Sequence, residues 1–180
     1  MQRETRAEES LGPERAADLN QALRDLAVEY AESLKQQLGD SLWAVVLYGS
    51  VARREAAPGS DIDLLIVADG LPRARLARHS VLEQADRSLE PKLQALRRQG
   101  IVTDVCPILK TPDEANRTSP LYLDLVEDAM ILHERNRFFS AILERLRASL
   151  RRLGARRIRR GRVRYWELKP DYVPGEVFRL

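Results

Sequence analysis

The chain has 180 residues and a formal net charge of +3, which suits one domain with a full hydrophobic core. No apolar run reaches the roughly 18 residues of a membrane-spanning helix, and residues 1–10 are charged, so we expect a cytoplasmic protein without a membrane span or secretory signal. A single cysteine, Cys106, excludes an internal disulfide and a cysteine-based zinc site, and we expect it to fill space in a strand.

The first third of the chain predicts a helix followed by two strands. Residues 1–13 are polar and end in Gly-Pro, which indicates a flexible lead-in. Leucines recur at three- and four-residue steps over 14–38, as in an amphipathic helix. Apolar runs predict strands at 42–48 and 62–67, joined through a short helix at 51–57.

The rest of the chain alternates helices with short strands. A long helix is predicted at 71–99, bent or split by Pro91, and a strand at 101–109. Three shorter elements follow: a helix at 121–128, a strand at 129–133 and a helix at 136–153. Residues 154–180 are basic and contain prolines, which favours an extended tail lying on a surface.

These elements make up one expected catalytic domain. We expect its core at 14–111 and a helical part of the same domain at 112–153, between the lead-in and the tail.

The most informative segment joins a Gly-Ser turn to two carboxylates. Gly49 and Ser50 are followed, after ten residues, by Asp61 and Asp63, which lead into an apolar run. Carboxylates two positions apart on a strand point the same way, with Cα atoms roughly 6.5–7 Å apart, and oxygen donors suit hard divalent cations. The N–H groups of the turn and the Ser50 hydroxyl can donate to a phosphate. A metal and a triphosphate would then lie side by side.

This segment resembles the signature of the minimal nucleotidyltransferases of the DNA polymerase β superfamily. The resemblance covers residues 43–109 well and is carried by the Gly-Ser pair, the ten-residue spacing and the Asp-x-Asp with apolar flanks. It implies an α+β fold, a small mixed sheet flanked by helices, here with a C-terminal helix and an extended tail. It also implies an enzyme that uses ATP and two Mg²⁺ ions. The family often has glycine where this chain has Arg54.

The resemblance assigns roles to three carboxylates. Asp61 and Asp63 would bridge the two metal ions. Enzymes of this kind take a third catalytic carboxylate from a neighbouring strand, and Asp104 is the acid inside a predicted strand downstream of Asp63. Asp104 would bind the metal nearest the acceptor hydroxyl and take up its proton. Strand geometry alone would make Asp104 a surface residue at the sheet edge.

The phosphate side of the site would use the turn. The Gly49 backbone and Ser50 would hold the β- and γ-phosphates, and Arg53, one turn into the next helix, would reach the triphosphate. Each feature has a plainer interpretation: Ser50 as an ordinary helix cap, Asp61 as a turn residue and Arg53 as an exposed arginine. Asp63 lies inside an apolar strand and has no such explanation, so the joint pattern favours the nucleotidyltransferase site.

A dense run of arginines follows the last predicted helix. It consists of Arg151, Arg152, Arg156, Arg157, Arg159, Arg160, Arg162 and Arg164. The run is either a docking surface for nucleic acid or an acidic partner, or simply a solvated helix end and loop.

The identity of the acceptor is implied only by the resemblance. Small proteins of this kind are similar to the MntA-type antitoxins of two-gene modules, whose partner is an all-helical HEPN ribonuclease toxin. This implies transfer of AMP from ATP to a tyrosine of the toxin. One alternative is an adenylyltransferase for a small hydroxylated molecule such as an aminoglycoside. Another is a non-catalytic module that binds RNA or a partner. Homo- and hetero-oligomers both stay open.

Overall fold

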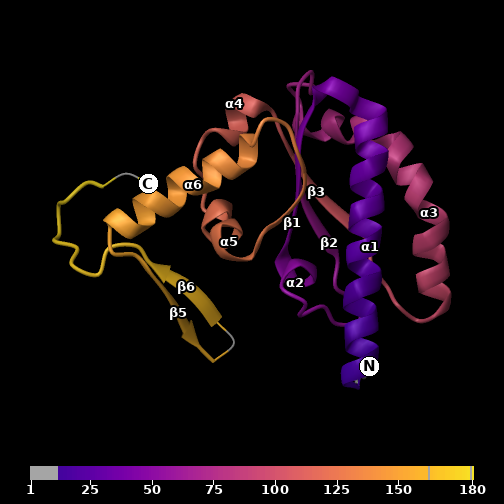
Figure 1. Cartoon of the computed structure of the whole chain (residues 1–180), viewed down its shortest axis with the longest axis horizontal. Helices are drawn as coiled ribbons and strands as arrows, with labels where there is room; N and C mark the ends of the chain where they lie inside the picture. The colour runs from indigo at the N-terminus through magenta and orange to yellow at the C-terminus, as the bar shows by residue number, and fades with distance from the viewer. Residues whose placement is uncertain (1–11, 162, 179) are drawn as a thin grey trace, which may run out of the picture.

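The chain begins its described fold with a long helix. The structure is a computed structural model that describes residues 12–161, 163–178 and 180 (Figure 1). Helix α1 spans Pro13–Leu38 and ends at Gly39, whose φ is +51°. The lead-in expected at 1–13 lies almost wholly outside the described residues. No helix of the described part is long and apolar enough to cross a membrane.

A four-stranded mixed sheet forms the centre of the molecule. Its strands are β1 (Leu42–Tyr48), β2 (Ile62–Ala68), β3 (Val105–Lys110) and β4 (Met130–Glu134). The order is β3-β2-β1-β4, with β1 antiparallel to β2 and β4, and β2 parallel to β3. The two central strands are apolar along almost their whole length because both of their faces are buried.

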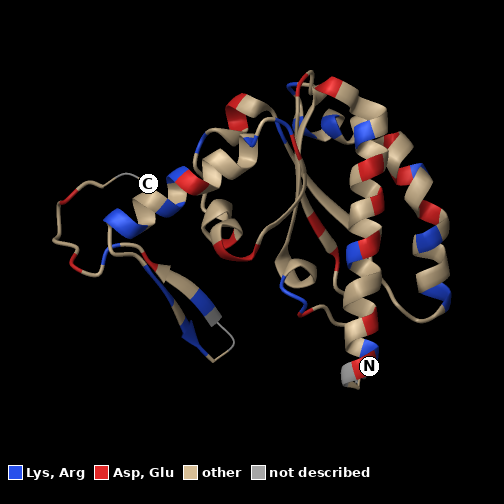
Figure 2. Cartoon of the chain, in the orientation of Figure 1, with Lys and Arg blue, Asp and Glu red and all other residues tan. Residues whose placement is uncertain are grey.

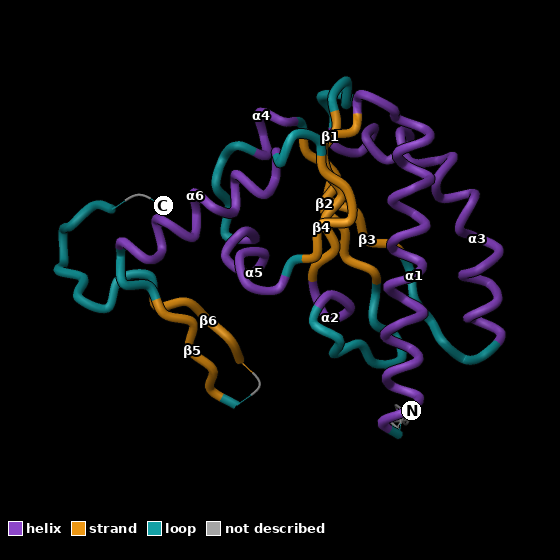
Figure 3. The backbone as a smooth tube through the Cα atoms, viewed as in Figure 1, coloured by secondary structure: helices purple, strands orange, loops and turns teal. Residues whose placement is uncertain are grey.

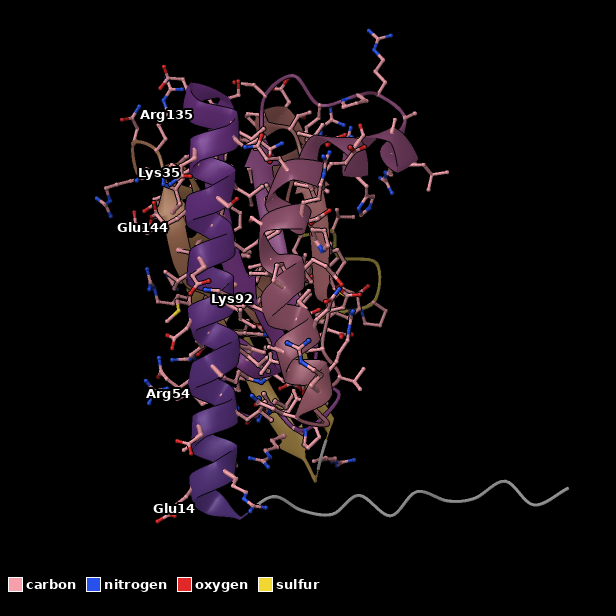
Figure 4. The ribbon with its side chains drawn as sticks, turned by 90° about the vertical axis from the view of Figure 1, so that its right-hand side faces the viewer. Glu14, Lys35, Arg54, Lys92, Arg135 and Glu144 are labelled. Carbon is pink, nitrogen blue, oxygen red and sulfur yellow. The ribbon has the colours of Figure 1, made fainter. Side chains whose placement is uncertain are left out.

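Helices cover the two faces of this sheet (Figures 1 and 3). Helix α1 and helix α3 (Glu83–Arg98) pack side by side on one face (Figure 4). An ion pair between Lys92 and Glu29 joins them. Helices α5 (Leu121–Asp128) and α6 (Phe138–Arg152) pack on the other face. The expected α+β arrangement, a small mixed sheet flanked by helices, is confirmed.

Two apolar clusters hold these layers together, one on each face of the sheet. The first joins α1 and α3 to the sheet through Leu23, Tyr30, Leu34, Leu89, Leu47 and Ile66. The second joins α5 and α6 to the other face through Tyr122, Leu125, Phe139, Leu146, Val46 and Leu65. Alternate residues of β1 and β2 therefore enter opposite clusters, as the two-residue period of a strand requires.

Four short helical turns connect the main elements. They are η1 (Gly39–Ser41), α2 (Gly49–Ala52), η2 (Arg75–Leu82) and α4 (Pro112–Ala115). The prediction of one helix over 71–99 is wrong in its first part, because Arg75–Leu82 form the 3-10 helix η2. The α-helix begins only at Glu83. Pro91 lies inside α3 without ending it. Strand β3 begins at Val105, four residues later than predicted.

The tail expected to be extended contains a β-hairpin instead. Strands β5 (Arg156–Arg160) and β6 (Val163–Glu167) form a separate two-stranded antiparallel sheet, in which β5 is mostly arginine and is coloured mostly blue in Figure 2. Trp166 and Leu168 pack against the second apolar cluster. The hairpin thus gains its stability from the domain on which it lies, which local composition does not reveal.

Candidate active site

The Gly-Ser turn lies directly against the second carboxylate. β1 ends at Tyr48, which is the strand partner of Asp63, and Gly49 follows with φ +74°. A Cβ atom at Gly49 would stand 2.1 Å from Oδ2 of Asp63. Glycine is therefore needed here both for its backbone conformation and for the close approach of the carboxylate.

The two carboxylates of the Asp-x-Asp pair differ in their surroundings. Asp61 precedes β2 and is exposed, whereas Asp63 lies within β2 and is partly buried. Burial raises the pKa of Asp63, the charge of Asp61 raises it further, and Arg53 acts in the opposite direction. These effects indicate two like charges held close together, with one cation nearby, which is the arrangement that a divalent ion would relieve.

Asp104 meets this pair from the neighbouring strand. Its backbone N–H donates to Oδ1 of Asp61 (3.2 Å), and its carbonyl oxygen accepts from the N–H of Ile62 (2.8 Å). Asp104 lies just before β3 rather than inside it, and its own carboxylate accepts from the N–H of Val105 (2.9 Å). The structure thus brings Asp104 beside Asp61, with its side chain turned toward the backbone.

The donor set fits a hard divalent cation only in part. Asp61, just before β2, and Asp63, within it, offer carboxylate oxygens close enough for one charge to act on the other, and oxygen is the ligand type that Mg²⁺ prefers. Within the described residues, no group of three or more His, Cys, Asp or Glu side chains is placed to share a metal ion. The Asp104 carboxylate accepts one N–H at Oδ1 and keeps its other oxygen for a ligand, and its metal role stays a prediction.

Cys106 belongs to this site rather than to the core. It is the strand partner of Asp63 on the edge strand β3, and it is exposed, as is Ile108 two residues further on. Burial raises the pKa of the Cys106 thiol, and the charges of Asp61 and Asp63 raise it further. The space-filling role expected for Cys106 is therefore wrong.

The predicted nucleotide-binding arginine is already engaged. Arg53 ends α2 and forms an ion pair with Glu55 (2.8 Å) and a longer one with Asp128 (3.9 Å). Ser50 is partly exposed, and its carbonyl oxygen accepts from the N–H of Glu55 (2.9 Å). Arg53 lies close enough to Asp63 for its charge to lower the pKa of that carboxyl, but carboxylates of the chain hold its guanidinium.

The next residue, Arg54, adopts a conformation that favours glycine. Its φ is +59°, in the left-handed region. This is the position at which the resembled family often has glycine, so the departure in sequence is also a local strain in the backbone. Arg54 lies beside the lower half of α1 in Figure 4.

Helix α1 fixes the segment after the turn with two side chains that the sequence did not single out. The Arg24 guanidinium donates to the carbonyl oxygens of Val51 (3.1 Å) and Ala52. The buried Asn20 side chain accepts from the N–H of Ala56 (2.9 Å). An asparagine within the apolar stripe of a predicted helix was the available signal, because a buried amide needs partners.

The C-terminal hairpin reaches the same segment through two arginines. Arg157 donates both terminal nitrogens to the Asp128 carboxylate (3.0 and 2.6 Å), and Arg164 pairs with Glu55. With Arg53 between Glu55 and Asp128, these residues form a continuous ion-pair chain from the hairpin to α2. Part of the arginine run thus has an internal role.

Comparisons with known proteins agree with this geometry. Residues 28–131, more than half of the chain, match the family model described as Nucleotidyltransferase domain, and this stretch contains the turn and all three carboxylates. MJ1305 of Methanocaldococcus jannaschii, whose name gives it as a candidate protein adenylyltransferase, is 33% identical over 133 residues. The match covers 73% of this chain and 85% of that protein.

Solved structures show a more distant likeness. A chain in the crystal structure of a toxin–antitoxin complex with AMP-PNP is 14% identical, with a TM-score of 0.43, over 71% of this chain and 92% of its own length. A chain in the complex of a tri-AMPylated Shewanella oneidensis HEPN toxin with its MNT antitoxin is 12% identical, with a TM-score of 0.41, over 73% and 92%. At these TM-scores the likeness carries no argument.

Proposed function

The chain belongs to the nucleotidyltransferase-domain family, and from that membership we propose that it is an Mg²⁺-dependent protein adenylyltransferase that uses ATP. The observation that carries the proposal is the contact between the Gly49 backbone and the Asp63 carboxylate. This contact supports the proposal because it brings a turn suited to phosphate against Asp63, one of the two carboxylates proposed to bind metal.

The proposed reaction is an in-line substitution at the α-phosphorus of ATP. The acceptor hydroxyl oxygen forms the new P–O bond, the bond to the β-phosphate oxygen breaks, and pyrophosphate leaves. Bound Mg²⁺ would supply positive charge to the attacking and leaving oxygens. Asp61 and Asp63 hold the ions, and the Asp104 carboxylate takes the proton of the hydroxyl.

The phosphate side of this mechanism uses the turn. The Gly49 and Ser50 N–H groups and the Ser50 hydroxyl donate to the β- and γ-phosphates. Arg53 would exchange its ion pairs with Glu55 and Asp128 for the triphosphate, which carries more negative charge than either carboxylate.

We assign the acceptor to a tyrosine of a HEPN-type toxin, which makes the chain the antitoxin of a two-gene module. The relative named as a candidate protein adenylyltransferase supports a protein acceptor. The ten-residue spacing between the Gly-Ser turn and the Asp-x-Asp pair supports the antitoxin class. The solved toxin–antitoxin complexes are too distant to count in its favour.

The test is transfer of labelled AMP. The purified chain is incubated with Mg²⁺, α-labelled ATP and lysate of the native host, beside the Asp61→Asn/Asp63→Asn variant. An Asp18→Asn variant, altered at an exposed position of α1, serves as the matched control. We expect a labelled protein band that needs Asp61 and Asp63, with the label on a tyrosine by mass spectrometry.

The other results would replace the proposal. Label in a small molecule would mean a small hydroxylated acceptor. Label that is absent, or that persists without the two carboxylates, would leave a binding module in place of an enzyme.

A further inference from the structure

A basic pocket lies at the end of β3 remote from the carboxylates. Its volume is about 480 Å³, within the usual range of small-molecule sites. Its walls come from η2, β3 and the segment from α4 to the start of α5. The charged residues that line it are Arg75, Arg78, Lys110, Glu114 and Arg117.

This pocket is distinct from the proposed reaction centre. Asp104 precedes β3, and Lys110 is the last residue of that strand. Six strand residues separate their Cα atoms by roughly 20 Å at about 3.3 Å per residue. None of Asp61, Asp63 and Asp104 lines the pocket, which reaches along β3 only as far as Pro107, so a phosphate held at Lys110 is separated from the three carboxylates.

The carboxylate of Glu114, which lines the pocket, is already neutralised. Arg78 is buried and donates to both oxygens of Glu114 (2.6 and 2.9 Å), and it also donates to the carbonyl oxygens of Pro72 and Leu109. The Arg78 guanidinium lowers the pKa of Glu114 to about 2. Glu114 is thus ionised at neutral pH, and its negative charge is balanced by Arg78.

Three further cations in the pocket have no such partner. Among the described residues, Arg75, Lys110 and Arg117 form no ion pair. The Lys110 ammonium lies over the Tyr122 ring, 4.8 Å from its centre. Burial lowers the pKa of Lys110, Glu114 raises it and Arg75 lowers it again, so Lys110 and Arg75 repel each other across the pocket.

We propose that this pocket binds a small ligand that carries two or more phosphate groups. Guanidinium groups and an ammonium complement phosphate oxygens, and the hydroxyls of Thr118 and Ser119 add neutral donors at the rim. A multiply charged anion removes the repulsion between Arg75 and Lys110, which a single carboxylate does only in part. The phosphates belong either to a nucleotide or to inorganic polyphosphate. This inference does not depend on the identity of the acceptor.

The test is calorimetric titration of the full chain with tripolyphosphate and with ATP. EDTA is present throughout, so that no divalent ion supports binding at Asp61 and Asp63. The Arg75→Gln/Lys110→Gln variant removes two pocket charges. The Arg98→Gln/Arg151→Gln variant removes the same charge from exposed positions elsewhere and serves as the matched control. Thermal unfolding checks that both variants fold.

We expect one-to-one binding by the wild-type chain and the control variant, weakened at least about 10-fold in the pocket variant. The Asp61→Asn/Asp63→Asn variant should bind as the wild type does. ATP and tripolyphosphate that bind alike indicate recognition of phosphate alone, and tighter ATP binding indicates a nucleotide. No binding below about 1 mM, or equal weakening in the control variant, would overturn the proposal.

Discussion

Gly49 and Asp63 are in contact across the β1–β2 pair, with no room for a side chain at position 49. The strand pairing of Tyr48 with Asp63 places the turn at this point, and the positive φ of Gly49 brings its backbone toward the carboxylate. The turn proposed to bind phosphate and the carboxylate proposed to bind metal therefore lie against each other, and a larger residue at position 49 would displace Asp63.

Replacement of Gly49 by alanine should reduce nucleotidyl transfer by about 100-fold or more, because a displacement of roughly 1 Å at a reacting group costs that much. Steady-state AMP transfer measures the loss. Gly100→Ala is the matched control, since Gly100 has a φ of +82° and a methyl group there would meet no atom within 4 Å, so that variant carries the backbone strain without the contact. Equal activity of the two variants would contradict the role given to the Gly49 contact.

Arg54→Gly should stabilise the protein by about 1 kcal/mol, because glycine adopts a φ of +59° without the cost that a side chain incurs. Arg54 also lies near Arg24, whose pKa is lowered by burial and then by Arg54, so the variant removes a repulsion as well. Thermal unfolding should show a rise of about 2–4 °C. Arg87→Gly, within helix α3, should instead lower stability by about 1 kcal/mol.

Asp63→Asn should stabilise the metal-free protein at neutral pH while it abolishes transfer. The pKa of Asp63 is raised in the folded state, so the folded state holds its proton more tightly than the unfolded state does. Ionisation of Asp63 therefore costs stability as the pH rises above the ordinary aspartate pKa of 3.8. Chemical unfolding in EDTA at pH 7 measures the difference. Asp18→Asn should change nothing, and a less stable Asp63→Asn variant would refute the electrostatic account.

Glu114→Gln should lower the free energy of unfolding at pH 7 by about 1–2 kcal/mol, because it leaves the buried Arg78 guanidinium without its carboxylate. This figure allows for screening of the partly exposed Glu114. The folded pKa of Glu114 is depressed, so its stabilisation is present above the unfolded value of 4.5 and is lost as the pH falls toward about 2.

The difference between wild type and Glu114→Gln should accordingly shrink over that pH window. Urea unfolding of both proteins at several pH values measures this difference in the free energy of unfolding. Glu83→Gln disrupts an exposed pair with Arg87 and should change stability by less than about 0.5 kcal/mol at pH 7.

Local sequence predicts those elements whose apolar residues follow a clear pattern along the chain. Strands 42–48 and 62–67 follow from apolar runs buried on both faces, and the Asp-x-Asp spacing brings Asp61 close enough for its charge to act on Asp63. Cys106 was misplaced because its exposure depends on β3 being an uncovered edge strand, which is a property of the topology.

The hairpin was missed for a related reason. Its strands read as a run of arginines with no continuous apolar face, and two of those arginines are held by Glu55 and Asp128, which lie far away in sequence. The ion pair of Arg53 could not be predicted for the same reason, since no sequence pattern around the turn indicates Asp128 as its partner.

The pairing of Arg164 with Glu55 spans 109 positions of the chain. During synthesis from the amino terminus, all four strands of the central sheet leave the ribosome before the hairpin does, because β4 ends at Glu134 and β5 begins at Arg156. The loop that follows the turn then gains its ion pair with Arg164 only after those strands have been made, so the basic hairpin is the last part of the described chain to join the candidate site.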